Sequence, residues 1–181
     1  MNHFLFRLIA ACGCTGFFFS QAHALSQNEL KQMIECSASH QQYAALGADY
    51  EKEFKTLGWK RINLPDQPLL YVYKNAKPIN LFGHATHEIA LSGNAILALY
   101  RDADVQQLAQ QFKIPEYTEY GKLPFFRGVK KVRTERGVDG DVSYHINLNL
   151  SEMQGKSNFV LLGCSYEPDR EEMERLLNST N

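Results

Sequence analysis

The sequence predicts an α+β domain with an antiparallel sheet of about five to seven strands and helices packed on one face. Two observations support this class. An amphipathic helical pattern comes first, and β-like runs then follow in two blocks, each with a helical pattern after it. The runs within a block are separated by short turn-like segments, which favours hairpins and therefore an antiparallel sheet.

The first helical pattern predicts one long N-terminal helix. Ser26 opens it with a capping-box signature, and apolar positions then recur every three or four residues as far as Leu57. A middle helix is expected over 105–112, with Asp102 or Asp104 as its N-cap.

The strand candidates are runs of β-branched, aromatic and other apolar residues bounded by turn signals. They are 69–74, 79–82, 87–91, 95–100, 126–136, 142–151 and 159–167. Pro168 then opens a short C-terminal helix. We expect this helix to pack on the sheet through Met173, Leu176 and Leu177.

Residues 1–24 have the pattern of a cleavable secretory signal peptide. The apolar run 8–19 is short of the roughly 20 residues that a membrane-spanning helix needs. Residues 22–24 (AHA) match the small-x-small cleavage pattern, so residues 25–181 form the predicted mature domain. A lipoprotein anchor at Cys12 is the less favoured alternative, because the apolar run before it is too short. We therefore expect a periplasmic protein that does not span the membrane.

Cys36 and Cys164 are the cysteines of the predicted mature domain. Both occupy positions that we expect to face the core. In an exported chain such a pair is most simply one disulfide, here joining the first helix to the last strand.

His84, His87 and Glu88 supply three potential zinc ligands within five residues. On a regular strand, however, the two imidazoles point to opposite faces of the sheet. A polar hairpin end without a cofactor is therefore the favoured interpretation, and a zinc site is the alternative.

Tyr117 and Tyr120 lie in a predicted loop, where tyrosine is well suited to a contact surface. Arg127 and Lys131 belong to a basic run that extends to Arg136. That run either meets an anionic partner or forms the solvated edge of the sheet, where lysine opposes aggregation.

The overall composition is 44% hydrophobic and 22% charged, with a formal net charge of −1, and this argues against a nucleic-acid binder. The sequence also lacks the common nucleophile, phosphate-binding and metalloprotease motifs. The leading hypothesis is an exported non-enzymatic protein that binds another protein or an envelope component, as inhibitors, immunity-type proteins and envelope accessory factors do. The alternatives are a metal-dependent protein that uses the histidine cluster and a domain that binds a small ligand or lipid.

Overall fold

The computed structural model describes residues 24–47, 49–118, 123–137, 140, 142–155 and 158–179. Its helices are α1 (Gln27–Ile34), α2 (His40–Leu46), α3 (Tyr50–Thr56), α4 (Val105–Phe112) and α5 (Arg170–Ser179). Its strands are β1 (Lys60–Ile62), β2 (Tyr71–Leu81), β3 (His84–Ser92), β4 (Ala95–Tyr100), β5 (Arg127–Arg136), β6 (Ser143–Met153) and β7 (Phe159–Pro168). Of the predicted signal peptide, residues 1–23 lie outside the described residues.

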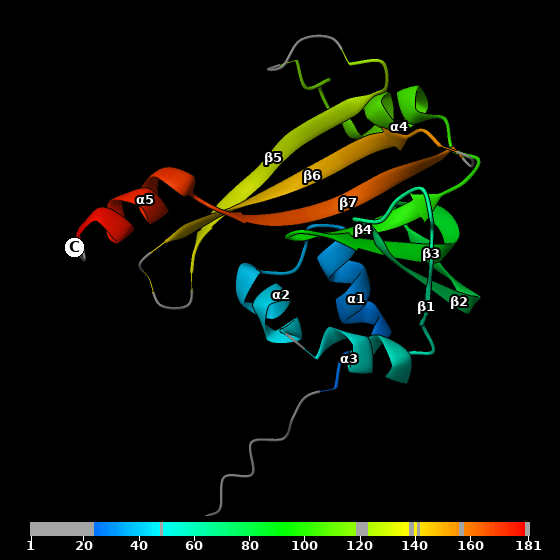
Figure 1. The fold of residues 1–181 in the computed structure, drawn as a ribbon, viewed down its shortest axis with the longest axis horizontal. Helices are drawn as coiled ribbons and strands as arrows, with labels where there is room; N and C mark the ends of the chain where they lie inside the picture. The colour runs from blue at the N-terminus through cyan, green and yellow to red at the C-terminus, as the bar shows by residue number, and fades with distance from the viewer. Residues whose placement is uncertain are drawn as a thin grey trace, which may run out of the picture.

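The described strands form one seven-stranded antiparallel sheet in the order β1-β2-β3-β4-β7-β6-β5 (Figure 1). Strands β2 to β4 and strands β5 to β7 are two meanders, each followed by a helix, and β4 pairs with β7 where the meanders meet. Gly163 lies opposite Leu97 at this junction, where an added Cβ would collide with the backbone of β4. The predicted α+β class and antiparallel sheet are confirmed.

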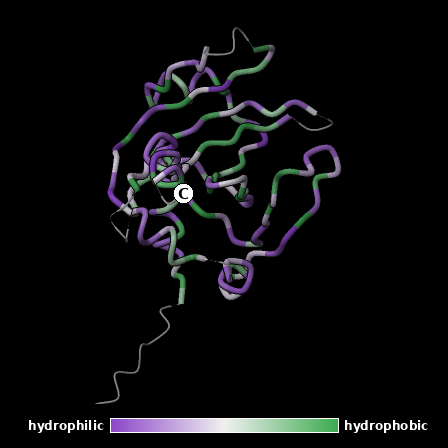
Figure 2. Tube along the Cα trace, turned by 60° about the vertical axis from the view of Figure 1, so that its left-hand side comes forward, coloured by the Kyte–Doolittle hydropathy of each residue, from purple (hydrophilic) through white to green (hydrophobic). Residues whose placement is uncertain are grey.

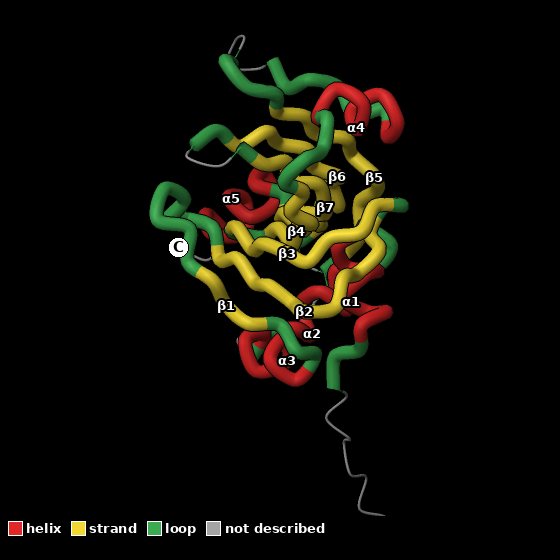
Figure 3. The backbone as a smooth tube through the Cα atoms, turned by 90° about the vertical axis from the view of Figure 1, so that its right-hand side faces the viewer, coloured by secondary structure: helices red, strands yellow, loops and turns green. Residues whose placement is uncertain are grey.

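Helices α1 to α4 pack on one face of the sheet, which we call the helix face. Its core includes Leu30 of α1, Phe54 of α3 and Leu108 of α4, packed with strand residues such as Ile146 and Leu162. Figure 3 shows α1 to α3 beside the first strands of the curved sheet and α4 beside β5 and β6. Hydrophilic and hydrophobic residues are mixed along the chain, as the colours of Figure 2 show, and within β6 the apolar residues Ile146, Leu148 and Leu150 alternate with polar ones. Strands β4 and β7, in the middle of the sheet, are buried along most of their length.

The other face of the sheet, which we call the opposite face, is covered only in part. The segment 63–70 lies over a second core that contains Val72, Ala90 and Leu161, and Leu64 and Leu70 pack against it. This core draws its strand residues from β2, β3, β4 and β7, with Met153 at the end of β6. The opposite face of β5 and most of β6 therefore lies beyond the core that this segment covers.

The predicted long N-terminal helix is wrong, because the structure forms three short helices there. The first break follows α1, where Cys36 adopts the left-handed conformation with φ 58°. Ser39 then caps α2 with its own capping box, completed by the side chain of Gln42. Gly47, with φ 52°, separates α2 from α3. The apolar spacing continues across these breaks, which is why it resembles a single helix.

The predicted packing of the C-terminal helix on the sheet is also wrong. Helix α5 extends away from the end of β7 (Figure 1) and buries none of its residues. It is held at its first turn, where the carboxylate of Glu172 accepts the N–H of Ser143 at 2.7 Å and pairs with Arg136 at 3.2 Å. Within the described chain, no helix is both long and apolar enough to cross a membrane.

Cys36 and Cys164 form a disulfide, the predicted pairing, with their Cα atoms 5.1 Å apart. The bond ties the segment after α1 to the central part of β7. Both residues are buried in the helix-face core. The disulfide therefore fixes the helical segment on the sheet.

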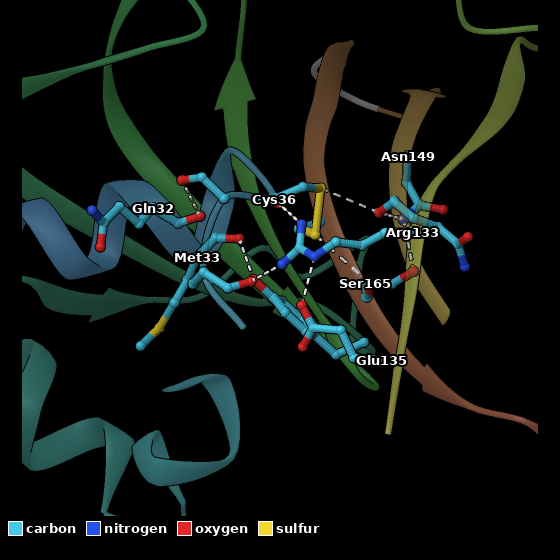
Figure 4. The surroundings of a disulfide bond; sticks show 12 residues. Gln32, Met33, Cys36, Arg133, Glu135, Asn149 and Ser165 are labelled. Atoms are coloured by element: carbon cyan, nitrogen blue, oxygen red, sulfur yellow. Dashed lines mark hydrogen bonds and ion pairs between the residues drawn. A yellow bond between two sulfur atoms is a disulfide. The ribbon is translucent and has the colours of Figure 1, made fainter. Parts of the chain in front are cut away.

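Arg133 of β5 makes a second connection to the same segment (Figure 4). Its guanidinium donates to the backbone carbonyls of Cys36 and Ala38 and to the carboxylate of Glu135. Glu135 also accepts the backbone N–H of His40 at 2.7 Å, at the start of α2. One ion pair thus joins the edge strand to both sides of the break between α1 and α2.

The ion pair predicts acid-sensitive stability. Burial raises the pKa of Glu135, but the hydrogen bond from His40 and the pairing with Arg133 outweigh it and hold this pKa below the ordinary value of 4.5. A carboxylate whose pKa is lower in the folded state contributes stability above its unfolded pKa, and loses it as the pH falls through the folded pKa. We expect Glu135→Gln to be less stable than wild type at pH 7 and to lose less stability between pH 5 and pH 3.

Urea unfolding at each pH measures this difference. Glu167→Gln is the matched control, because Glu167 is an exposed carboxylate on β7. An acid dependence of Glu135→Gln equal to that of wild type would show that the Glu135 carboxylate carries no such linkage.

Candidate binding site

Tyr117 reaches the sheet through the short segment that follows α4. Asp104 caps the start of α4 by accepting the N–H groups of Gln106 and Gln107, which decides between the two predicted N-caps. After α4 ends, the backbone N–H of Tyr117 donates to the carbonyl of Arg127 at 2.7 Å. The segment is therefore attached to the outer edge of β5.

Gly128 makes this attachment possible. It is bridged to Glu116, and an added Cβ would lie 2.7 Å from both the Ile114 side chain and the Pro115 carbonyl oxygen. Real Cβ atoms do not approach other atoms so closely, so only glycine lets the segment lie against the strand. The result is that two predicted partner-binding residues, Tyr117 and Arg127, become neighbours.

Tyr117 and Arg127 line a hollow of about 430 Å³, which we call the β5 hollow. Its described lining is Tyr117, Leu123, Phe125, Arg127, Gly128, Val129, Asn149 and Ser151. The Arg127 guanidinium lies 5.2 Å from the centre of the Phe125 ring, a cation–π contact that holds the cation at the hollow. This lining contains one cation and no carboxylate among the described residues, so it is electrostatically suited to an acidic group.

Lys131 extends the cationic character of the β5 hollow along the strand. Val129 and Lys131 are paired with Asn149 and Asn147, and all four lie on the opposite face of the sheet together with Arg127. Val129 is 37% exposed, so part of this surface is apolar. Tyr120, the remaining predicted contact residue, lies outside the described residues.

The rest of the basic run has structural partners. Lys130 donates to the carbonyl of Phe112 at the end of α4, at 2.9 Å. Arg133 joins the network beside the disulfide, and Arg136 pairs with Glu172. Strand β5 is at the edge of the sheet, as the solvated-edge interpretation expects. Lys130 and Arg133 are therefore structural cations on the helix face, Arg136 is paired with Glu172 at the end of the strand, and Arg127 and Lys131 lie on the opposite face.

His84, His87 and Glu88 lie around a separate hollow of about 740 Å³, which we call the Glu88 hollow. Glu88 is buried and its carboxylate pairs with Arg101 at 2.7 Å and with Lys74 at 3.6 Å.

Neither histidine pairs with the Glu88 carboxylate; each contacts a neighbouring neutral group instead. The Nδ1 atom of His87 lies 2.9 Å from the carbonyl oxygen of Asn75, and a carbonyl only accepts, so Nδ1 carries the hydrogen. His84 meets the ring of Tyr100 edge-to-face. Among the described residues, no group of three His, Cys, Asp or Glu side chains is placed to hold a metal ion.

Lys74 and Arg101 are the residues of the Glu88 hollow that sequence reasoning missed. Lys74 lies directly opposite Glu88 on β2, and Arg101 follows the end of β4, the strand on the other side of Glu88. The sequence shows that both residues are cations, but only the register of β2, β3 and β4 places them beside the Glu88 carboxylate.

The fold and the β5 hollow define an α+β protein with a curved antiparallel sheet and a cationic, aromatic hollow at its edge strand. A scan of family models, a search of curated proteins and a search of solved structures each find no match for this chain.

Proposed function

We propose that this chain is an exported, non-enzymatic binding protein whose partner is another protein of the cell envelope. The observation that supports this best is the β5 hollow, which gathers Tyr117, Phe125 and Arg127 where the second core does not reach. Tyrosine and arginine are enriched at the energetically dominant positions of protein interfaces. Asn149 and Ser151 add neutral hydrogen-bonding groups beside them.

The partner segment that suits this surface is acidic and extended. Arg127 and Lys131 supply positive charge on one face of β5, and the described lining of the hollow supplies no carboxylate to offset it. Complementary charge speeds association and selects partners. An extended segment is favoured because the surface follows a strand, in the direction that the attached residues Glu116 and Tyr117 already take.

Export is supported by the N-terminal pattern and by the disulfide, since such bonds persist mainly in oxidising compartments. Leu25, the first residue of the predicted mature chain, packs against the helix-face core, and its backbone nitrogen lies 2.9 Å from the Glu53 carboxylate. Cleavage before Leu25 would convert this nitrogen into an ammonium group, which strengthens the contact.

We therefore expect N-terminal sequencing of the protein recovered from the periplasm to begin at Leu25. Retention of the chain in the cytoplasm with an intact Met1 terminus would contradict export.

The binding proposal is tested by affinity capture from an envelope extract, with bound proteins quantified by mass spectrometry. We expect Tyr117→Ala combined with Arg127→Ala to reduce recovery of the specific partner at least about tenfold. The matched control combines Arg61→Ala with Tyr71→Ala, because Arg61 lies 4.5 Å over the Tyr71 ring near the other edge of the sheet. Equal capture of the partner by wild type and by the Tyr117/Arg127 variant would refute the proposal that the partner binds at the β5 hollow.

A further inference from the structure

A buried ion-pair cluster forms the base of the Glu88 hollow. The Glu88 side chain is only 7% exposed, and one of its oxygens accepts from both Nε and Nη2 of Arg101, at 2.9 and 2.7 Å. Its other oxygen lies 3.6 Å from the Lys74 ammonium. One buried carboxylate therefore pairs with two cations, and the three side chains together carry a net positive charge.

Both cations keep hydrogen-bonding capacity for a further group. The side chains of Lys74 and Arg101 are 57% and 40% exposed, and both line the hollow. Glu88 occupies Nε and Nη2 of the guanidinium, which leaves Nη1 as a donor. Among the described residues, neither cation pairs with a second carboxylate.

The remaining lining is suited to an organic molecule. Ala76, Ala85 and Leu99 contribute apolar surface, and Asn75 and the two histidines contribute polar groups. A volume of about 740 Å³ is in the range of small-molecule sites, which combine apolar walls with a few fixed polar groups.

We propose that the Glu88 hollow binds a small organic molecule that carries a carboxylate or phosphate group, with Lys74 and Arg101 contacting the anionic group. Glu88 is a positioning residue in this site, because it holds both cations and has no charge left unpaired. The site is independent of the β5 surface proposed above and adds a second ligand class to the protein.

Asp102 provides a further test of the proposed anion site. It lines the same hollow with an exposed carboxylate, and no ion pair to Lys74 or Arg101 is formed among the described residues. An anionic ligand approaches against the charge of Asp102, so removal of that charge is expected to strengthen binding.

The test is an NMR titration of the ¹⁵N-labelled protein at constant ionic strength with phenyl phosphate, benzoate and the uncharged analogue benzamide. We expect saturable shifts of the Glu88, Leu99 and Arg101 amides with at least one of the two anions, and at least tenfold weaker binding of benzamide. The anion that binds more tightly shows whether the site prefers a phosphate or a carboxylate.

Two cation variants and two controls accompany the titration. Lys74→Gln and Arg101→Gln are each expected to weaken anion binding at least roughly fivefold, and Lys74→Gln, which removes the more exposed and more distant cation, is expected to leave the rest of the spectrum unchanged. Lys77→Gln, an exposed lysine of β2 that does not line the hollow, is expected to bind as wild type, and Asp102→Asn is expected to bind about twofold more tightly. The proposal is overturned if neither anion saturates, if benzamide binds equally well, or if both cation variants bind as wild type.

Discussion

Replacement of both cysteines by alanine is expected to lower the free energy of unfolding by roughly 4 to 5 kcal/mol, less any strain that the bond stores in the folded protein. Cys36 and Cys164 are separated by 128 positions, so the bond closes a loop that spans most of the domain. On the chain-entropy model, a longer loop means a larger loss of freedom in the unfolded chain and a larger stabilisation. Urea unfolding under oxidising conditions measures the loss.

The single variants Cys36→Ala and Cys164→Ala provide the control. Each removes the same bond, so each is expected to lose about as much stability as the double variant. Wild type unfolded and refolded in reductant should approach the same value. Clearly additive losses in the single variants would show that the two residues do not act through one bond.

Replacement of Arg133 by methionine is expected to cost roughly 2 to 3 kcal/mol of unfolding free energy. The guanidinium serves two backbone carbonyls near the disulfide and the carboxylate of Glu135, and methionine satisfies none of them. Fully buried pairs cost more when broken, but the Arg133 side chain is 31% exposed, so water offsets part of the loss.

Two further variants isolate the cause of this loss. Lys131→Met changes a cation two positions earlier on the same strand, at an exposed site, and is expected to stay within about 0.5 kcal/mol of wild type. Arg133→Lys is expected to recover only part of the stability, because lysine lacks the planar fork that reaches several acceptors. A loss in Arg133→Met no larger than that in Lys131→Met would contradict the proposed network.

The fold class could be predicted because its signals are local. The alternating residues of β6 and the capped pattern of α4 each identify an element without knowledge of its neighbours. The three-helix break was also signalled locally, since Ser39 and Gln42 form a second capping box inside the apolar pattern. The apolar periodicity continues through this capping signal and favours a single helix, and the left-handed turn at Cys36 has no comparable signature.

The position of α5 could not be predicted in the same way. Its apolar face resembles that of a packed helix, but Leu177 is 63% exposed and Met173 is 39% exposed. Where a helix lies depends on what its first turn contacts, here Ser143 and Arg136 at the end of the β5–β6 hairpin. Such contacts depend on tertiary structure that periodicity does not encode.

In both candidate sites, the residue types could be predicted from the sequence, but their arrangement in space could not. Residue type alone indicates Tyr117 and Arg127, but their meeting at one hollow depends on Gly128 and on the edge position of β5. His84 lies at the start of β3, beside the turn that follows β2, whereas the pairing of Glu88 with two cations depends on strand register. The chemical character of each side chain can thus be predicted from the sequence, but which side chains meet depends on the pairing of the strands.

Hydrogen–deuterium exchange of the protein, alone and with the captured partner, locates the binding surface. If the partner binds at the β5 hollow, we expect slower exchange at the amides around Tyr117 and in residues 127–131, because an extended segment would cover them. Exchange elsewhere, including strands β2 to β4, should change little. Protection confined to α5 or to strands β2 to β4, with 117 and 127–131 unaffected, would show that the partner binds elsewhere than at the β5 hollow.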